Sequence, residues 1–91
     1  MGKLYSVDID GILCKVTDYK QQLTAQPILD NITKVNKLYD DGQIIILHTA
    51  RREADRSITI HWLAKNNVKY HAIVMGKLKA DIYIDDKNGQ L

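Results

Sequence analysis

The chain has 91 residues, of which 45% are hydrophobic and 26% charged, a composition typical of one globular domain. Its thirteen basic and eleven acidic residues leave a net charge of +2, too small and too dispersed to favour a nucleic acid or a membrane as partner. The one cysteine, Cys14, excludes a disulfide framework and a Cys/His zinc site, and no apolar stretch suits a signal peptide or a membrane span. We therefore expect a cytoplasmic protein. Because a chain this short buries a small core, association into a homo-oligomer is also compatible with the sequence.

The first predicted element is a β-strand. Residues Leu4 to Ile9 are rich in β-branched and aromatic side chains, and Asp10-Gly11 marks the exit from this strand. Residues 12–25 are mixed in character and include the polar run 17–22. We expect this segment to be a surface excursion that acts as a small flap.

A helix and a buried strand come next. Pro27 suits the first turn of a helix that Asp41-Gly42 ends, and apolar residues repeat between them at helical spacing. These apolar residues are Ile28, Ile32, Val35 and Tyr39. Residues 44–47 form an uninterrupted apolar run, typical of a parallel strand that helices cover on both faces, and Thr49 follows at its end.

A second helix and two further strands complete the pattern. The helix is predicted over residues 53–65, with Asn66-Asn67 as its terminator. The apolar residues on one side of it, with Trp62 expected in the core, are Ala54, Ile58 and Trp62. Strands are predicted at residues 70–74, followed by Gly76-Lys77, and at residues 82–84.

This alternation of elements predicts an α/β fold with one domain over residues 1–91. We expect a three-layer, Rossmann-like arrangement with right-handed crossovers and a mainly parallel sheet. Two acidic pairs follow predicted strands, Asp8 with Asp10 and Asp85 with Asp86. Because ligands bind at the carboxyl ends of the strands in open α/β sheets, both pairs are expected to meet there and to form one magnesium site.

A threonine and a lysine, Thr49 and Lys77, stand between these acidic pairs. The order Asp-x-Asp, Thr, Lys, Asp-Asp over residues 7–87 resembles the four motifs of the haloacid dehalogenase-like phosphohydrolase superfamily. Within this superfamily, the motif sequences are similar to those of small members that are associated with capsular polysaccharide genes and lack a cap domain. These motif sequences are Asp-Ile-Asp-Gly, His-Thr-Ala-Arg, Gly-Lys and Tyr-Ile-Asp-Asp-Lys. The intervals between the motifs are likewise too short to hold a cap.

The resemblance implies a Mg²⁺-dependent phosphatase that works through an aspartyl-phosphate. Asp8 would be the nucleophile, and Asp10 would protonate the leaving group and then activate water. Mg²⁺ would take oxygen ligands from Asp8, from the backbone carbonyl of Asp10 and from one acid of the final pair. Asp85 is our first choice for that acid, with Asp86 orienting a metal-bound water or Lys77, and the reverse assignment stays open.

The other motif residues would bind the phosphate or the substrate. Thr49 would donate its hydroxyl to a phosphoryl oxygen and Lys77 would neutralise charge, with Lys79 as the competing lysine. Arg51 follows Thr49 near a helix start, and two interpretations stay open: it grips a substrate acid or sugar hydroxyl, or it stands in solvent. The expected phosphate- and substrate-binding residues are Gly11, Thr49, Ala50, Arg51 and Lys77.

Several polar residues stand outside this constellation. Tyr19 and Lys20 are candidates for touching substrate from the flap. The three histidines lack the spacing of metal ligands and are expected to be structural or exposed. They are His48, His61 and His71.

Two departures from the family pattern bear on this interpretation. Ile12 stands where the family usually has threonine or valine, so no hydroxyl is available to tie down the turn. The chain ends five residues after Asp86, where relatives often add a helix and a strand. We therefore expect a sheet edge that is open or paired with another subunit.

Three functions are compatible with these residues. The leading hypothesis is a phosphatase acting on a small phosphorylated metabolite, for example a phosphosugar. A receiver-like phosphoacceptor module uses the same residue types, but it places the acidic pair first and the phosphoacceptor later, the reverse of this chain. A degenerate relative that binds a metal or a partner without catalysis is the third hypothesis, motivated by Ile12 and the abrupt C-terminus.

Overall fold

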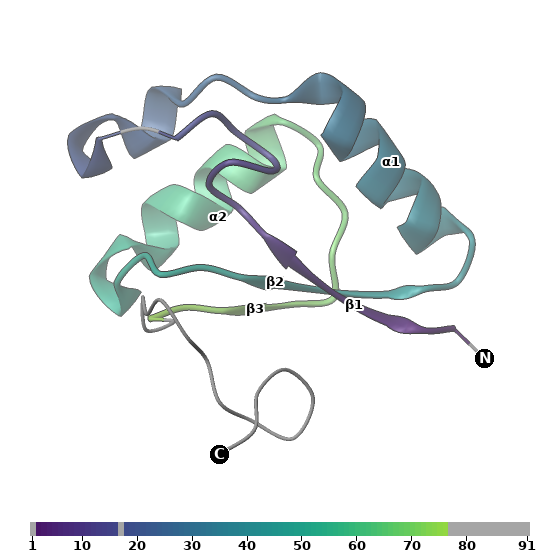
Figure 1. The fold of residues 1–91 in the computed structure, drawn as a ribbon. Coiled ribbons are helices and arrows are strands. Elements are labelled where there is room, and N and C mark those ends of the chain that lie inside the picture. Colours follow the sequence, from purple (N-terminus) through teal and green to yellow (C-terminus); the bar gives the residue numbers. More distant parts are fainter. Residues whose placement is uncertain (1, 17, 77–91) are drawn as a thin grey trace, which may run out of the picture.

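The computed structural model of the chain describes residues 2–16 and 18–76 (Figure 1). In chain order its elements are β1 (Leu4–Asp8), η1 (Tyr19–Thr24), α1 (Leu29–Asp40), β2 (Ile44–His48), η2 (Glu53–Asp55), α2 (Arg56–Lys65) and β3 (Ala72–Val74). The expected Rossmann-like α/β fold with a parallel sheet is confirmed. The predicted strand at residues 82–84 lies outside the described residues.

The three described strands form one sheet in the order β1-β2-β3, and both neighbouring pairs are parallel. In this register Leu47 of β2 stands between Val7 of β1 and Ile73 of β3. Both α1 and α2 lie on the same side of the sheet (Figure 1), as right-handed crossovers require when successive strands are added in one direction. No helix among residues 2–16 and 18–76 covers the other face.

The hydrophobic core lies between the sheet and these two helices. Ile45 and Leu47 point into it and are fully buried, whereas Ile44 is 36% exposed, because successive strand residues face opposite sides of the sheet. The apolar run of β2 therefore has one helix-covered face within the described chain, where the sequence predicted two. The helix α1 contributes Ile32 and Val35 to the same core.

The helix α1 begins two residues after the position predicted from Pro27. Pro27 instead forms an antiparallel bridge with Cys14, and the backbone N–H of Ile28 donates to the carbonyl of Leu13 at 2.8 Å. These bonds hold the chain in an extended conformation up to the start of the helix. The predicted stop is confirmed, since Gly42 has a φ of 91°, which favours glycine directly after a helix.

The buried face of α2 differs from the predicted one. Trp62 is 1% exposed and lies in the core as expected, but Ile58 is 42% exposed and Ala54 is also exposed. The buried residues of the helix are Thr59, Trp62 and Leu63. The helix is thus rotated so that a threonine hydroxyl faces inward, where it meets a buried polar group described below.

The segment predicted as a surface flap contributes to the core. Leu13 and Cys14 are fully buried and Ala25 is 6% exposed, so the prediction of a surface excursion is wrong at these positions. The carbonyl of Ile9 accepts from the backbone N–H of Leu13 at 2.9 Å, which turns the chain back over the core. The segment is fastened at its far end by Trp62, whose Nε1–H donates to the carbonyl of Ala25 at 2.8 Å.

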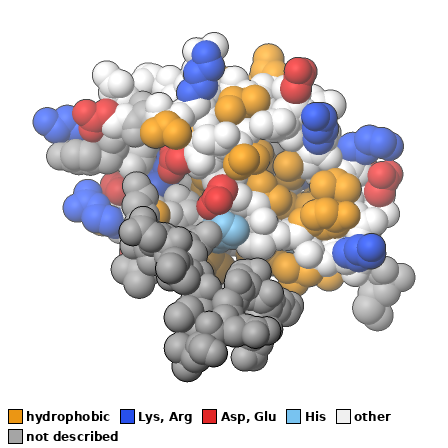
Figure 2. Space-filling view, in the orientation of Figure 1, with side chains coloured by type: hydrophobic (Ala, Val, Ile, Leu, Met, Phe, Trp, Pro, Cys, Tyr) orange, Lys and Arg blue, Asp and Glu red, His pale blue; other side chains and the backbone are white. Residues whose placement is uncertain are grey.

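Charged side chains of both signs are interspersed around the face of the molecule in Figure 2, with hydrophobic side chains between them. This distribution agrees with the small net charge of the sequence. Among the described helices, none has the length and apolar character needed to cross a membrane.

Replacing Trp62 by Phe should destabilise the fold. The substitution keeps a large apolar ring but leaves the buried carbonyl of Ala25 without its donor. We expect the free energy of unfolding to fall by about 1–3 kcal/mol in urea denaturation. The control Ile60→Val, at a residue 39% exposed on the same helix, should change it by less than about 0.5 kcal/mol. Equal stability of Trp62→Phe and wild type would contradict a role for this bond.

Candidate functional site

The candidate site lies at the carboxyl ends of β1 and β2. Asp8 is the last residue of β1, and His48, the last residue of β2, is its partner in the sheet register. Asp10 and Thr49 follow directly in the two loops. Parallel strands bring these loops to the same edge of the sheet. That this edge also receives the second acidic pair stays a prediction, because Asp85 and Asp86 lie outside the described residues.

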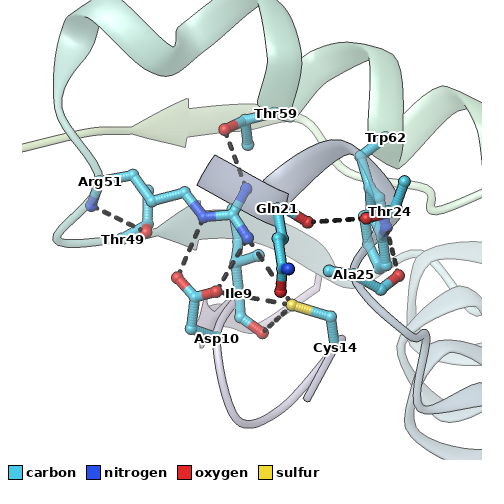
Figure 3. A network of polar contacts seen from close by, with 10 residues as sticks. All are labelled: Ile9, Asp10, Cys14, Gln21, Thr24, Ala25, Thr49, Arg51, Thr59 and Trp62. Carbon is cyan, nitrogen blue, oxygen red and sulfur yellow. Dashed lines mark hydrogen bonds and ion pairs between the residues drawn. The ribbon is translucent and has the colours of Figure 1, made fainter. Parts of the chain in front are cut away.

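Asp10 is held by a two-pronged ion pair with Arg51 (Figure 3). Arg51 Nε donates to Asp10 Oδ2 at 3.0 Å, and Arg51 Nη2 donates to Asp10 Oδ1 at 2.8 Å. The planar guanidinium matches both oxygens of a carboxylate, and such charge-assisted pairs fix orientation as well as position. The Asp10 carboxylate is thus locked in one orientation, with its side chain 32% exposed.

Arg51 is buried, with 6% of its surface exposed, and it connects several parts of the fold. Its Nη1 donates to Thr59 Oγ1 of α2 at 3.1 Å, and its backbone N–H donates to Thr49 Oγ1 at 3.1 Å. Its backbone carbonyl accepts from the N–H of Gly76, just after β3, at 2.7 Å. Arg51 is therefore no solvated arginine, and its guanidinium is turned inward to Asp10 within the described chain.

The positioning role of Arg51 was missed in the sequence. A buried arginine requires several acceptors, and these come from residues far apart in the chain. One signal was present: Thr59 stands three residues before Trp62, on the face that becomes the interior of α2. A polar residue at such a position indicates a buried partner for its hydroxyl.

Asp8 has a different environment from Asp10. Its side chain is 49% exposed, and its Oδ1 lies 2.8 Å from Nε2 of His48. Among the described residues, His48 is the one that contacts this carboxylate, and it does so at Oδ1. The Asp-x-Asp motif therefore contains one fully engaged carboxylate and one that is accessible and half engaged.

Thr49 is 2% exposed and its Oγ1 accepts a bond from the backbone of Arg51, which leaves the hydroxyl hydrogen available as a donor. Ala50, the residue after Thr49, is exposed, and so is Gly11, the residue after Asp10. Gly11 has a φ of 88°, in the left-handed region that residues with a Cβ rarely adopt. The predicted phosphate-binding residues Gly11, Thr49 and Ala50 thus lie in the two loops that follow β1 and β2.

The turn after β1 is tied down despite the absence of a hydroxyl at residue 12. The carbonyl of Ile12 accepts from the side-chain amide of Asn31 at 2.9 Å, and the N–H of Gly11 donates to the carbonyl of Cys14 at 2.8 Å. A bond from α1 therefore takes the place of the threonine expected from the family pattern. Asn31 was not identified in the sequence.

Four of the predicted residues lie outside the described part of the chain. They are Lys77, its competitor Lys79, and the acidic residues Asp85 and Asp86. Of the two residues expected to act from the flap, Lys20 is exposed and its backbone N–H is bonded to the side chain of Asp18, while the side chain of Tyr19 is not described.

The donor atoms at this edge fit a magnesium ion. Mg²⁺ prefers hard oxygen ligands and keeps several waters, and the carboxylate side chain of Asp8 is 49% exposed, two residues before Asp10. Within residues 2–16 and 18–76, no three His, Cys, Asp or Glu side chains group as metal ligands. The acid of the final pair that the sequence predicts as a further ligand, Asp85 or Asp86, lies outside the described residues.

The histidines fall into two groups. His61 is exposed and His71 accepts a bond from the backbone of Ile45 while stacking on Tyr39, so both match the expectation of exposed or structural residues. His48 differs because it contacts Asp8 directly. The spacing of metal ligands, on which the prediction rested, gives no information about such a contact.

Cys14 lies beneath the Asp10–Arg51 pair. Its Sγ is 3.6 Å from Asp10 Oδ1 and 3.7 Å from Arg51 Nη2 (Figure 3). Burial, and secondarily the negative charge of Asp10, raise the pKa of the thiol from 9.0 to about 11. The thiol is therefore neutral at physiological pH and acts as a small buried group that packs against the ion pair.

Replacing Arg51 by Lys should destabilise the protein. An ammonium group cannot reproduce the planar bonds to both oxygens of Asp10 and the bond to Thr59 at once. We expect the free energy of unfolding to fall by about 2–4 kcal/mol in urea. Arg56→Lys is a matched control, because Arg56 makes the same two-pronged pair with Glu53 on the surface and should change little. Equal effects of the two substitutions would contradict the importance of burial.

The neutral thiol of Cys14 should make stability depend on pH in the alkaline range. Because the pKa is 9.0 when unperturbed and about 11 in the fold, the thiol's contribution is complete below pH 9. It is lost as pH rises to 11, since only the unfolded thiol ionises there. The stability advantage of wild type over Cys14→Ala, measured in urea at each pH, should shrink by about 2–3 kcal/mol between pH 8.5 and 11. A constant difference would contradict the raised pKa.

Comparison with known proteins extends this description. No family model and no curated protein matches the chain significantly. A chain from the structure of a Pnkp1/Rnl/Hen1 complex is similar in fold, with a TM-score of 0.74 and 22% identity over 94% of this chain and 31% of that one. A structural-genomics target from Vibrio cholerae has a TM-score of 0.72 and 30% identity over 94% of this chain and 80% of its own. The chain therefore belongs to the same protein family as this Vibrio cholerae protein.

Proposed function

We propose that this protein is a Mg²⁺-dependent phosphatase that hydrolyses a small phosphomonoester through an aspartyl-phosphate on Asp8. The observation that carries the proposal is the difference between the two carboxylates of the Asp-x-Asp motif. The side chain of Asp8 is half exposed and the described residues engage only its Oδ1, whereas both oxygens of Asp10 are held by Arg51. A nucleophile needs an accessible oxygen, and an acid–base group needs a fixed orientation.

In the proposed reaction Asp8 attacks the phosphorus and Asp10 handles the proton. Asp10 must carry a proton on one oxygen to donate it to the leaving group, and at that moment it keeps only one of its two bonds to Arg51. When the proton has left, the carboxylate regains both bonds. Arg51 thereby returns Asp10 to the same orientation for the second step, in which it accepts a proton from water.

The remaining parts of the site would bind the phosphate. The Thr49 hydroxyl has a hydrogen to donate to a phosphoryl oxygen, and the exposed backbone at Gly11 and Ala50 borders the same edge of the sheet. Lys77 is proposed to neutralise the phosphate. A magnesium ion held by Asp8, the carbonyl of Asp10 and Asp85 or Asp86 would supply positive charge against the phosphoryl oxygens.

The strand order favours this proposal over a receiver-like phosphoacceptor. Receiver domains have the first strand between the second and the third, in the order 2-1-3-4-5. Here β2 is the middle strand of the described sheet, which corresponds to the 3-2-1 half of the other doubly wound order. This observation adds to the motif order, in which the acidic pair comes last rather than first.

The proposal is tested by phosphate release from a panel of phosphorylated metabolites and an aryl phosphate, with and without Mg²⁺. Asp8→Asn removes the nucleophile and should lower kcat at least about 1,000-fold. Asp10→Asn removes the proton donor and should lower it about 100- to 10,000-fold, less for the aryl phosphate, whose leaving group needs little protonation. Asp30→Asn, in the exposed first turn of α1, is the control.

The outcomes separate the three hypotheses. Turnover with Mg²⁺ that depends on Asp8 supports the phosphatase. A stable phosphoryl group on Asp8 without turnover would indicate a phosphoacceptor module. Wild-type protein that neither turns over nor becomes phosphorylated across the panel would contradict the proposal and leave a non-catalytic relative.

A further inference from the structure

The two strands β1 and β2 place a serine, a histidine and an aspartate on one face of the sheet. Asp8 and His48 are partners in the parallel register, and Ser6 stands two residues before Asp8, so its side chain projects on the same side. These three residues belong to the strands themselves. Their relative positions are therefore fixed by the backbone hydrogen bonds of the sheet rather than by a loop.

The His48 ring is engaged at both nitrogens. Nδ1 forms a hydrogen bond with the hydroxyl of Ser6, and Nε2 lies 2.8 Å from Asp8 Oδ1. A carboxylate oxygen only accepts, so Nε2 carries the proton in this contact. The Ser6 hydroxyl satisfies Nδ1 in either state of that nitrogen, because it donates to a bare nitrogen and accepts from a protonated one. Ser6 thus keeps Nε2 directed at Asp8.

We infer that His48 is a positioning residue for Asp8 and assists the breakdown of the aspartyl-phosphate, an inference that rests on the proposed function. The bond to Oδ1 leaves Oδ2 as the attacking oxygen. It holds the carboxylate so that its open oxygen is presented toward the substrate, and it remains in place after Oδ2 has become bonded to phosphorus.

The chemistry of the two steps shows where this bond acts. In the first step Asp8 Oδ2 bonds to phosphorus, the bond from phosphorus to the leaving oxygen breaks, and the proton of Asp10 goes to that oxygen. In the second step a water oxygen bonds to phosphorus, its proton goes to Asp10, and the Oδ2–phosphorus bond breaks with its electron pair returning to Asp8. The Nε2–H of His48 stabilises the negative charge that then spreads onto Oδ1.

The same segment therefore holds both carboxylates. His48 contacts Asp8, and Arg51, three residues later, contacts Asp10, with Thr49 between them. The His-Thr-Ala-Arg sequence acts as one unit that positions the nucleophile and the acid–base group separately. Within the described chain His48 contacts only Oδ1 of Asp8, whereas Arg51 bonds to both oxygens of Asp10.

The test compares His48→Leu with His48→Gln. Leucine removes the donor, whereas the glutamine amide nitrogen provides an N–H near the position of Nε2. For His48→Leu we expect kcat to fall about 10- to 100-fold, with a larger fraction of phosphoryl-enzyme in acid-quenched steady-state samples, because breakdown slows more than formation. His48→Gln should restore most of kcat. His61→Leu, at an exposed histidine of α2, is the control and should match wild type.

A second variant tests the same contact if His48→Leu does not fold. Ser6→Ala removes only the bond at Nδ1 and should lower kcat about 3- to 10-fold, as expected for the loss of one hydrogen bond. An independent readout without turnover is ¹⁵N NMR of the imidazole, which should show a protonated Nε2 in wild type and a changed His48 signal in Ser6→Ala and Asp8→Asn.

The outcomes distinguish this inference from the proposed function. If wild type turns over but His48→Leu retains its kcat and its phosphoryl-enzyme fraction, the inference is wrong and the phosphatase proposal stands. Equal losses in His48→Leu and His48→Gln, without accumulation of phosphoryl-enzyme, would indicate a purely structural histidine and also overturn it. Absence of turnover in wild type would instead remove the proposed function itself.

Discussion

A guanidinium group inside the core sets the conditions that the surrounding structure must meet. An arginine side chain carries a positive charge and five N–H donors, and such a group is stable away from water only when its donors have partners. The guanidinium of Arg51 donates to Asp10 and to Sγ of Cys14, which both follow β1, and to Thr59 on α2. Its backbone N–H donates to Thr49 Oγ1 after β2. Folding of the candidate site and folding of the core are therefore one event, because the loop after β1 and the inner face of α2 close over the same group.

The Asp-x-Asp motif produces two different environments within three residues. Ile9, between the two aspartates, is fully buried and anchors the motif to the core. Asp8 still belongs to the strand and has a strand neighbour, His48, whereas Asp10 lies in the turn and meets Arg51. The end of the strand thus separates an accessible carboxylate from a held one. The two carboxylates therefore differ in exposure because one residue lies in the strand and the other in the turn that follows it.

Elements with a regular hydrophobic pattern were predictable, and contacts between distant polar residues were not. The strand predicted at residues 44–47 and the helix stop at Asp41-Gly42 follow from local patterns. The position of Thr49 directly after that strand follows in the same way. The inner face of α2 was misassigned, because Thr59 is buried for its hydroxyl and not for its hydrophobicity. The burial of Cys14 was not predicted, because the polar residues of its segment suggested a surface flap. The contact of His48 with Asp8 was not predicted either, because no sequence periodicity relates the two residues.

The hydrogen bond between the N–H of Gly76 and the carbonyl of Arg51 links the exit of the third strand to the centre of the site. Gly76 has a φ of 80°, in the left-handed region that residues with a Cβ rarely adopt. Arg51 therefore connects two parts of the structure. Its side chain orients Asp10, and its main-chain carbonyl holds Gly76 just after β3. A substitution that displaces the backbone at Arg51 would shift both together, so errors in one part of the site would propagate to the other.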